Sequence, residues 1–204
     1  MEAAGSGSFV DTTAHRYNQP FTSIPIAGMY ILITGAAGSG TSTLATALGE
    51  ATHARVLETD DYFWRPTDPP YQQKFGAEER HSLLLNDLRT SPDAVVAGAL
   101  IDWGQELENA FDFVVFLYLP TAIRLARLKL REERRFGQAD PEFLAWAAQY
   151  DAGTAEGRSL ERHRQWMKKL NCPVLCLESD ESVEIRLQRV LAARNAIIQG
   201  SRSH

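Results

Sequence analysis

Cysteine is scarce in this chain of 204 residues. Only Cys172 and Cys176 occur, as an isolated pair with three residues between them. A disulfide framework or a cysteine-based zinc site needs more sulfur ligands than this pair offers. We therefore expect neither, and we interpret both cysteines as small apolar residues on or beside a strand.

The chain also lacks a long hydrophobic run and an excess of positive charge. No apolar run approaches the ~18 residues that a membrane-spanning helix requires, and the first residues lack the basic start and apolar centre of a signal peptide. The net charge is −5, whereas domains that bind the phosphate backbone of nucleic acids are usually basic. We expect a cytoplasmic location, no membrane partner and no nucleic-acid partner.

Lysine is the third shortage. Of the 21 basic residues only 4 are lysine, and none of these lies near the glycine-rich segment described below. Arginine supplies the remaining positive charge and is concentrated between Arg124 and Arg135. Six basic and two acidic residues there give a local charge of +4 within an acidic chain.

What the chain does have is an alternation of strand-like and helix-like stretches, with 44% hydrophobic residues. We expect residues 1–28, rich in Gly, Ser, Thr and Pro, to form a flexible extension, and residues 29–204 to form one domain. Strands are expected over 29–34, 55–59, 94–100, 113–119 and 174–177. Helices are expected over 42–53, 78–90, 105–110, 121–135, 141–150, 159–170 and 182–198. Such alternation predicts an α/β fold with a parallel sheet, helices on both faces, and ligands at the carboxyl ends of the strands.

The most informative segment follows the first expected strand. Three glycines occur in a turn between that strand and a helix, which is typical of a phosphate-binding P-loop. The usual pattern continues with Lys and then Ser or Thr, but here Thr41 occupies the lysine position and Ser42 follows it. Backbone N–H groups and the helix N-terminus attract phosphate without a lysine. The residues expected to hold a nucleotide are Gly35, Ala36, Ala37, Gly38, Ser39, Gly40, Thr41, Ser42 and Thr43. The alternative is a glycine-rich turn with no ligand.

An acidic pair, Asp60 and Asp61, follows the second expected strand. Carboxylates at the carboxyl end of a strand, facing a phosphate-binding loop, are suited to orienting Mg²⁺ and to accepting a proton from a substrate hydroxyl. We expect catalytic roles for both residues and a metal-binding role for Asp60, together with Ser42. The alternative is that the pair caps a turn.

Aromatic residues and arginines lie in the segment after the acidic pair. Rings there are suited to forming a wall for a ring-bearing substrate, and a guanidinium group to binding an anionic substrate group. Residues with these properties, or a glycine that allows close approach, are the candidates for acceptor binding: Tyr62, Trp64, Arg65, Arg80, Gly98, Trp103 and Arg158. Core packing is the alternative for the aromatic residues. Asp102 is a weaker acidic candidate, for which a role in a turn is the alternative.

An arginine stripe follows the fourth expected strand. At ~100° per residue, five arginines fall on one helix face: Arg124, Arg127, Arg131, Arg134 and Arg135. Guanidinium groups bind phosphoryl oxygens bidentately and stay charged. We expect Arg127, Arg131 and Arg134 to be catalytic, and Arg127 or Arg131 to replace the charge of the missing lysine. A solvated helix face is the alternative, and His163, further on, is expected to be structural.

Taken together, the glycine loop, the acidic pair and the arginine stripe resemble the P-loop nucleoside and nucleotide kinase superfamily over about residues 29–198. The chain is most similar to an uncharacterised, adenylate-kinase-like bacterial branch in which Gly-Thr likewise replaces Gly-Lys. The resemblance implies a three-layer sandwich with a five-stranded parallel sheet and a short arginine-bearing lid. It also implies ATP at the glycine loop, Mg²⁺ at Ser42, and adenine near Ser179 and Asp180.

Two departures from the family pattern leave two functions open. Thr41 removes a charge from the phosphate site, and the Asp-Gly-Phe-Pro-Arg substrate motif of true adenylate kinases is absent. The leading hypothesis is ATP- and Mg²⁺-dependent phosphoryl transfer to a small molecule such as a nucleoside or nucleotide. The alternative is a catalytically weak ATP-binding regulatory protein or NTPase.

Overall fold

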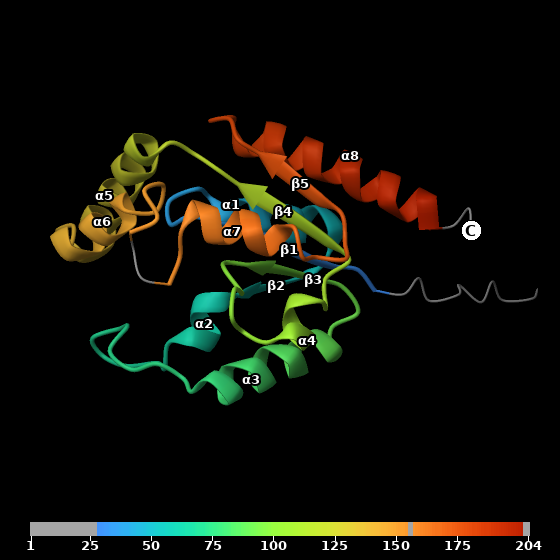
Figure 1. Cartoon of the computed structure of the whole chain (residues 1–204), viewed down its shortest axis with the longest axis horizontal. Helices are drawn as coiled ribbons and strands as arrows, with labels where there is room; N and C mark the ends of the chain where they lie inside the picture. The colour runs from blue at the N-terminus through green and yellow to red at the C-terminus, as the bar shows by residue number, and fades with distance from the viewer. Residues whose placement is uncertain (1–27, 155–156, 202–204) are drawn as a thin grey trace, which may run out of the picture.

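A parallel sheet forms the centre of the molecule (Figure 1). The computed structural model describes residues 28–154 and 157–201. Within these residues the sheet has five strands: β1 (Tyr30–Gly35), β2 (Arg55–Glu58), β3 (Ala94–Ala97), β4 (Phe113–Leu117) and β5 (Val174–Leu177). All neighbouring strands pair in parallel, in the order β2-β3-β1-β4-β5. The expected α/β fold with a five-stranded parallel sheet is therefore confirmed.

Helices connect these strands and follow the last one. In the described part of the chain they are α1 (Thr41–Thr52), α2 (Thr59–Phe63), α3 (Ala77–Arg89), α4 (Gln105–Glu108), α5 (Thr121–Phe136), α6 (Pro141–Ala148), α7 (Leu160–Met167) and α8 (Val183–Ser201). All seven expected helices are present, and α2 is an addition.

Different helices cover the two faces of the sheet. Side chains alternate along a strand, so that Ile31 and Ile33 of β1 belong to the core cluster that includes α1 and α8, while Leu32 belongs to the cluster on the other face. That second cluster includes Leu84 of α3 and Trp166 of α7. Burial on both faces explains why the three central strands, β3, β1 and β4, are nearly continuous apolar runs.

The helices α5 and α6 lie beyond the carboxyl ends of the strands, at the left of Figure 1. The P-loop begins at the same edge, because Gly35, the last residue of β1, pairs with Leu117, the last residue of β4. The chain then passes through Pro120, the N-cap of α5. The loop and the arginine-bearing helix are therefore neighbours at the edge where such sheets bind ligands.

Three strands end earlier than the sequence pattern predicts, and the fourth strand of the chain is one of them, since it ends at Leu117 and not at residue 119. The third ends at Ala97, because Gly98 has a φ of +126° and turns the chain away from the sheet. The second ends at Glu58, where Thr59 begins the short helix α2. Asp60 and Asp61 lie in the first turn of α2, where the helix dipole favours acidic side chains.

Among the described helices, none combines the length and the apolar composition needed to cross a bilayer. The extension expected over residues 1–28 lies, apart from Gly28, outside the described residues.

Candidate functional site

The P-loop follows a tight path that its glycines permit. A Cβ atom on Gly35 would lie 2.4 Å from the carbonyl oxygen of Leu117, and one on Gly38 would lie 2.8 Å from that of Arg124. Gly38 and Gly40 also have positive φ angles, of 82° and 97°. These positions therefore exclude other residues through crowding or through backbone strain.

The helix α1 begins where the loop ends. Its N-cap is Gly40, which has no side chain to bond the first N–H groups of the helix. Those N–H groups have no partner within the helix, and together with the helix dipole they attract anions. Thr41 is half-buried at this end, while Ser42 and Thr43 are exposed. The predicted nucleotide-binding residues thus form one turn of suitable geometry for phosphate.

A carboxylate that the sequence-based prediction missed lies closest to this turn. The hydroxyl of Ser42 donates a hydrogen bond of 3.0 Å to Oε2 of Glu58, the last residue of β2. Burial raises the pKa of the half-buried Glu58 carboxyl, with further contributions from Asp60 and Asp61, while the Ser42 hydrogen bond opposes the rise. Glu58 therefore connects the P-loop to the acidic pair. Its position at the end of a strand, one residue before an expected strand end, concealed it.

The acidic pair itself is exposed. Both carboxylates act on Glu58 by charge repulsion, and it is Glu58 that accepts the hydrogen bond from the Ser42 hydroxyl. Asp60 and Asp61 remain predicted catalytic residues, and the structure adds Glu58 as the carboxylate in direct contact with the loop.

A magnesium ion would find few protein ligands here. In the described residues no group of three or more His, Cys, Asp and Glu side chains is arranged to hold a metal. Mg²⁺ in phosphoryl-transfer sites usually takes one or two carboxylates, several waters and the phosphates of the substrate. The hydrogen-bonded pair of Ser42 and Glu58 fits that sparse donor set.

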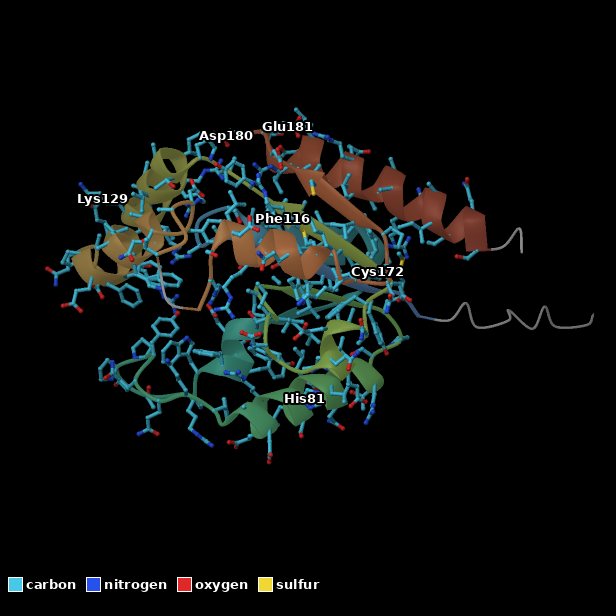
Figure 2. All side chains as sticks on the ribbon, viewed as in Figure 1. His81, Phe116, Lys129, Cys172, Asp180 and Glu181 are labelled. Carbon is cyan, nitrogen blue, oxygen red and sulfur yellow. The ribbon has the colours of Figure 1, made fainter. Side chains whose placement is uncertain are left out.

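The arginine stripe divides into an exposed part and a buried residue. Arg127, Arg131, Arg134 and Arg135 line an open hollow of about 470 Å³ on α5. Arg127 also forms a 2.5 Å ion pair with Asp180, which lies in the turn before α8 and faces α5 in Figure 2. The predicted adenine-side residue Asp180 and the predicted catalytic residue Arg127 are thus brought together.

The other exposed arginines extend away from this pair. Arg131 pairs with the adjacent Glu132 at 3.0 Å. Arg135 donates a 2.8 Å hydrogen bond to the Tyr71 hydroxyl, and its guanidinium lies 5.6 Å from the centre of that ring. Arg134 is exposed on the same hollow. The Arg135–Tyr71 contact joins α5 to the segment between α2 and α3.

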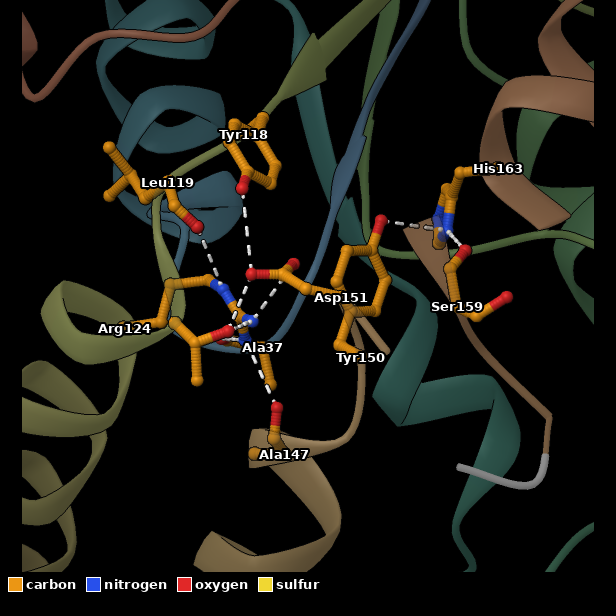
Figure 3. A network of polar contacts seen from close by, with 10 residues as sticks. Ala37, Tyr118, Leu119, Arg124, Ala147, Tyr150, Asp151, Ser159 and His163 are labelled. Carbon is orange, nitrogen blue, oxygen red and sulfur yellow. Dashed lines mark hydrogen bonds and ion pairs between the residues drawn. The ribbon is translucent and has the colours of Figure 1, made fainter. Parts of the chain in front are cut away.

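Arg124 is not part of the exposed stripe, contrary to the helical-wheel prediction. It is fully buried, and its guanidinium donates hydrogen bonds to the carbonyl oxygens of Leu119 and Ala147 at 3.0 and 3.2 Å and to that of Ala37 at 3.4 Å. An ion pair with Asp151 at 3.4 Å completes the network (Figure 3). Arg124 therefore ties the P-loop to α5 and α6 and does not face solvent.

A second buried arginine, Arg186 of α8, was also missed. Its Nη1 donates a 3.0 Å hydrogen bond to the carbonyl oxygen of Ser39, and its Nη2 a 2.7 Å bond to that of Ser179. The P-loop itself is compact, because the Ser39 N–H donates a hydrogen bond of 3.1 Å to the carbonyl oxygen of Ala36. The α-helical pattern of residues 182–198 suggested no role beyond packing for this arginine.

On the acceptor side, Arg80 lies between two aromatic rings. Its guanidinium is 5.2 Å from the ring centre of Phe63 and 4.9 Å from that of Trp103. In the described part of the chain its buried Nε has no hydrogen-bond partner. Arg80 and Trp103 are therefore in contact, and both remain predicted acceptor-binding residues.

Two other predicted acceptor residues have close protein neighbours. Tyr62 is buried, and its hydroxyl donates a 2.5 Å hydrogen bond to Asp87 of α3. A Cβ atom on Gly98 would lie 1.8 Å from Oγ1 of Thr59. Core packing, the alternative stated for the aromatic residues, accounts for Tyr62, and the close neighbour at Gly98 is the Thr59 side chain.

Trp64 and Arg65 lie in the segment that leads to α3. Trp64 packs edge-on against Tyr71, with ring centres 5.8 Å apart. Arg65 pairs with Glu79 and lies 4.4 Å from the ring centre of Phe75. These contacts shape an aromatic, charged surface facing α5.

Arg158 lies near Ala37 of the P-loop. It lies 5.8 Å from the ring centre of Trp146, and it lines a small space of about 10 Å³ together with Ala37. Asp102 is exposed and pairs with Arg162 of α7. Arg158 thus lies near the P-loop, whereas Asp102 is paired with Arg162.

His163 lies in the core behind the loop. Its ring nitrogens lie 3.1 Å from the hydroxyl of Tyr150 and 3.1 Å from the carbonyl oxygen of Ser159 (Figure 3). The ring also lies 3.3 Å from Oγ1 of Thr34. Burial lowers the pKa of His163 to about 4. The neutral ring is a fixed part of the structure, in agreement with the structural role expected for it.

Similarity to known proteins extends over more than half of the chain. A family model described as AAA domain matches residues 31–143, which is more than half of the chain. The uncharacterized protein YqaC of Bacillus subtilis (strain 168) is 41% identical over 171 residues, covering 79% of this chain and 94% of that protein.

Solved structures share the fold at low sequence identity. Shikimate kinase from Acinetobacter baumannii, in complex with shikimate, superposes with a TM-score of 0.56 at 17% identity, covering 83% of this chain and 94% of that one. A gluconokinase from Sinorhizobium meliloti 1021 gives 0.52 at 18% identity, with 87% and 98% covered. Deoxyadenosine kinase from M. mycoides with bound dATP gives 0.52 at 14% identity, with 82% and 99% covered. The chain belongs to the AAA domain family and has the P-loop fold of these small-molecule kinases.

Proposed function

We propose that this protein catalyses ATP- and Mg²⁺-dependent phosphoryl transfer to a small-molecule acceptor. The observation that carries the proposal is the 3.0 Å hydrogen bond from Ser42 to Glu58 at the mouth of the P-loop. It joins the first turn of an anion-binding helix to a carboxylate at the end of the neighbouring strand β2. A glycine-rich turn that binds no ligand would not require a hydrogen bond between Ser42 and Glu58.

The phosphate side of the proposed site depends on the backbone. The N–H groups at the start of α1 would hold the triphosphate, because phosphate favours a helix N-terminus. The exposed guanidinium groups of Arg127, Arg131 and Arg134 would cover the transferred group. Arg127 supports this role, because its Nη1 lies 3.9 Å from the position of a Cβ atom on Gly40. Positive groups that act on the charge developing during transfer are worth about 10²–10³ in rate.

Ser42 and Glu58, with Asp60 nearby, are the residues that would hold Mg²⁺. The ion, when bound, would neutralise phosphate charge. The raised pKa of Glu58 follows from burial and from the two neighbouring aspartates, and a cation beside these carboxylates would favour their charged forms.

The acceptor side would select an anionic molecule with a hydroxyl group. Arg80, held between Phe63 and Trp103, and Arg158 are the groups proposed to bind its negative charge. Asp60 or Asp61 would accept the hydroxyl proton while the acceptor oxygen bonds to the γ-phosphorus and the bond to the leaving oxygen of ADP breaks.

The test is transfer of the γ-phosphoryl group from ATP to a panel of nucleosides, nucleotides, sugar acids and hydroxy acids, with Mg²⁺ present. We expect transfer to at least one anionic acceptor, and its loss in Glu58→Gln. ATP binding without transfer to any acceptor would favour the alternative, an ATP-binding regulatory protein, which Thr41 at the lysine position makes the second candidate.

A further inference from the structure

We infer that Arg186 supplies the fixed positive charge of the phosphate site that Thr41 does not provide. The inference rests on the proposed function, because it concerns how the same loop binds a triphosphate. It assigns the compensating charge to α8 and not to the exposed arginines of α5.

Arg186 is buried against the P-loop. Only 4% of its surface is exposed to solvent. Its two hydrogen bonds, to the carbonyl oxygens of Ser39 and Ser179, hold the guanidinium between the P-loop and the turn before α8. A guanidinium has five N–H donors. In the described residues its buried Nε has no partner.

Among the described residues, no carboxylate forms an ion pair with Arg186. The two acidic residues that attract it are Asp180 and Glu181, yet Asp180 pairs with Arg127 and Glu181 pairs with Arg189. A buried charge without an ionic partner is costly. Burial and the repulsion of Arg127 accordingly lower the pKa of Arg186.

Two like charges also converge at one point of the loop. A Cβ atom on Gly40 would lie 3.5 Å from Nη1 of Arg186 and 3.9 Å from Nη1 of Arg127. Gly40 immediately precedes Thr41, where a P-loop lysine would stand. Two guanidinium groups that repel each other, held beside helix N–H groups that have no partner within α1, form a site that a polyanion would stabilise.

The two arginines would act differently. Arg186 is fixed by backbone carbonyl groups, so its charge is present equally in the ground state and the transition state. Uniform binding of this kind changes affinity and leaves kcat largely unaffected. Arg127 is exposed and held by an exposed aspartate, so it is free to reach the transferring group after binding. Loss of Arg186 should therefore weaken ATP binding more than it slows transfer.

The experiment is a double-mutant cycle between positions 41 and 186, measured as affinity for ATP and for inorganic tripolyphosphate. Arg186→Gln is expected to weaken both affinities at least tenfold. Thr41→Lys should tighten binding at least threefold more in the Arg186→Gln background than in the wild type, because both groups serve one charge. Arg194→Gln, about two turns further along α8 and without a part in the phosphate site, is the matched control and should stay within twofold of the wild type.

Equal effects of Thr41→Lys in both backgrounds, or an Arg186→Gln variant that binds as the wild type does, would overturn the inference. If Arg186→Gln does not fold, the Arg186 Nε–H resonance, assigned by its absence in Arg186→Lys, decides: it should shift when tripolyphosphate is added, and no shift overturns the inference. A wild type that binds both ligands but transfers no phosphoryl group would refute the proposed function while leaving the inference to be judged by these affinities.

Discussion

The two ends of the proposed site are made in different ways. At the phosphate end, glycines and buried arginines hold a backbone turn, and the contacts of Arg124 and Arg186 with that turn end on carbonyl oxygens. At the acceptor end, side chains form the surface, through rings and ion pairs such as those around Arg80 and Arg65. Backbone geometry recognises any phosphate chain, whereas side chains select one molecule. The type of phosphate donor can therefore be predicted from the sequence more readily than the identity of the acceptor.

The largest expected effect separates backbone from side chain within the P-loop. Gly40→Val introduces a branched side chain at a φ of 97° and next to two guanidinium groups, so ATP binding should be abolished. Thr41→Ala should keep most of the affinity, since the N–H donors remain. Calorimetric titration with ATP measures both. Equal loss in the two variants would show that the Thr41 side chain, and not the backbone, binds the phosphates.

The acidic residues test the junction of the two ends. Glu58→Gln and Asp60→Asn keep the shape of each side chain and remove its charge, so phosphoryl transfer should be lost in Glu58→Gln and should fall about 10²-fold in Asp60→Asn. The melting temperature should change little in Asp60→Asn because the side chain is exposed. Normal transfer rates in both variants would leave these carboxylates with a role in turn structure alone.

The pH dependence of the free energy of unfolding should come from His163, which is buried beside Thr34 of β1. The pKa of His163 is about 4 in the folded state, against about 6.5 when unfolded. Above pH 6.5 the ring is neutral in both states and its contribution is fully present. As the pH falls from about 6.5 to about 4, the unfolded chain binds a proton that the native ring does not, so unfolding becomes easier by about 3 kcal/mol.

Urea unfolding at several pH values measures this dependence. The matched variant is His163→Gln, which should lose stability at pH 7 but show a flatter dependence between pH 6.5 and 4. If the wild type and the variant show the same slope, other groups cause the acid sensitivity.

A smaller and more selective effect is expected at the acceptor end. Arg80→Met keeps contact with Phe63 and Trp103 but removes the charge, so the KM for an anionic acceptor should rise about tenfold. The affinity for ATP should remain unchanged. Steady-state kinetics with each substrate varied in turn separates the two. A parallel loss of ATP affinity would mean that the two ends are not independent.

The smallest effect concerns the exposed ion pair between Arg127 and Asp180. Asp180→Asn releases Arg127 at little cost, because exposed ion pairs contribute about 0–1 kcal/mol. The melting temperature should hold, and ATP affinity should rise by no more than a few-fold. Weaker ATP binding would indicate that Asp180 contacts the nucleotide directly.

The sequence predicted the fold because local patterns and topology agree. The apolar runs of β1, β3 and β4 and the glycine turn before α1 are visible without coordinates. Glu58 and Arg186 were missed for a different reason: each takes its role from residues distant in the chain, Ser42 and Ser39 respectively. Arg124 was misplaced because helical periodicity specifies a face of α5 but not that α6 and Asp151 cover its first turn.

The most direct test of the account is the affinity of the wild type for ATP with Mg²⁺ and with EDTA, compared with the same pair of values for Glu58→Gln. If Ser42 and Glu58 form the metal end of a phosphate site, Mg²⁺ should tighten ATP binding about tenfold or more in the wild type and much less in the variant. An ATP affinity that does not respond to Mg²⁺ in the wild type, or that responds equally in both proteins, would contradict the account.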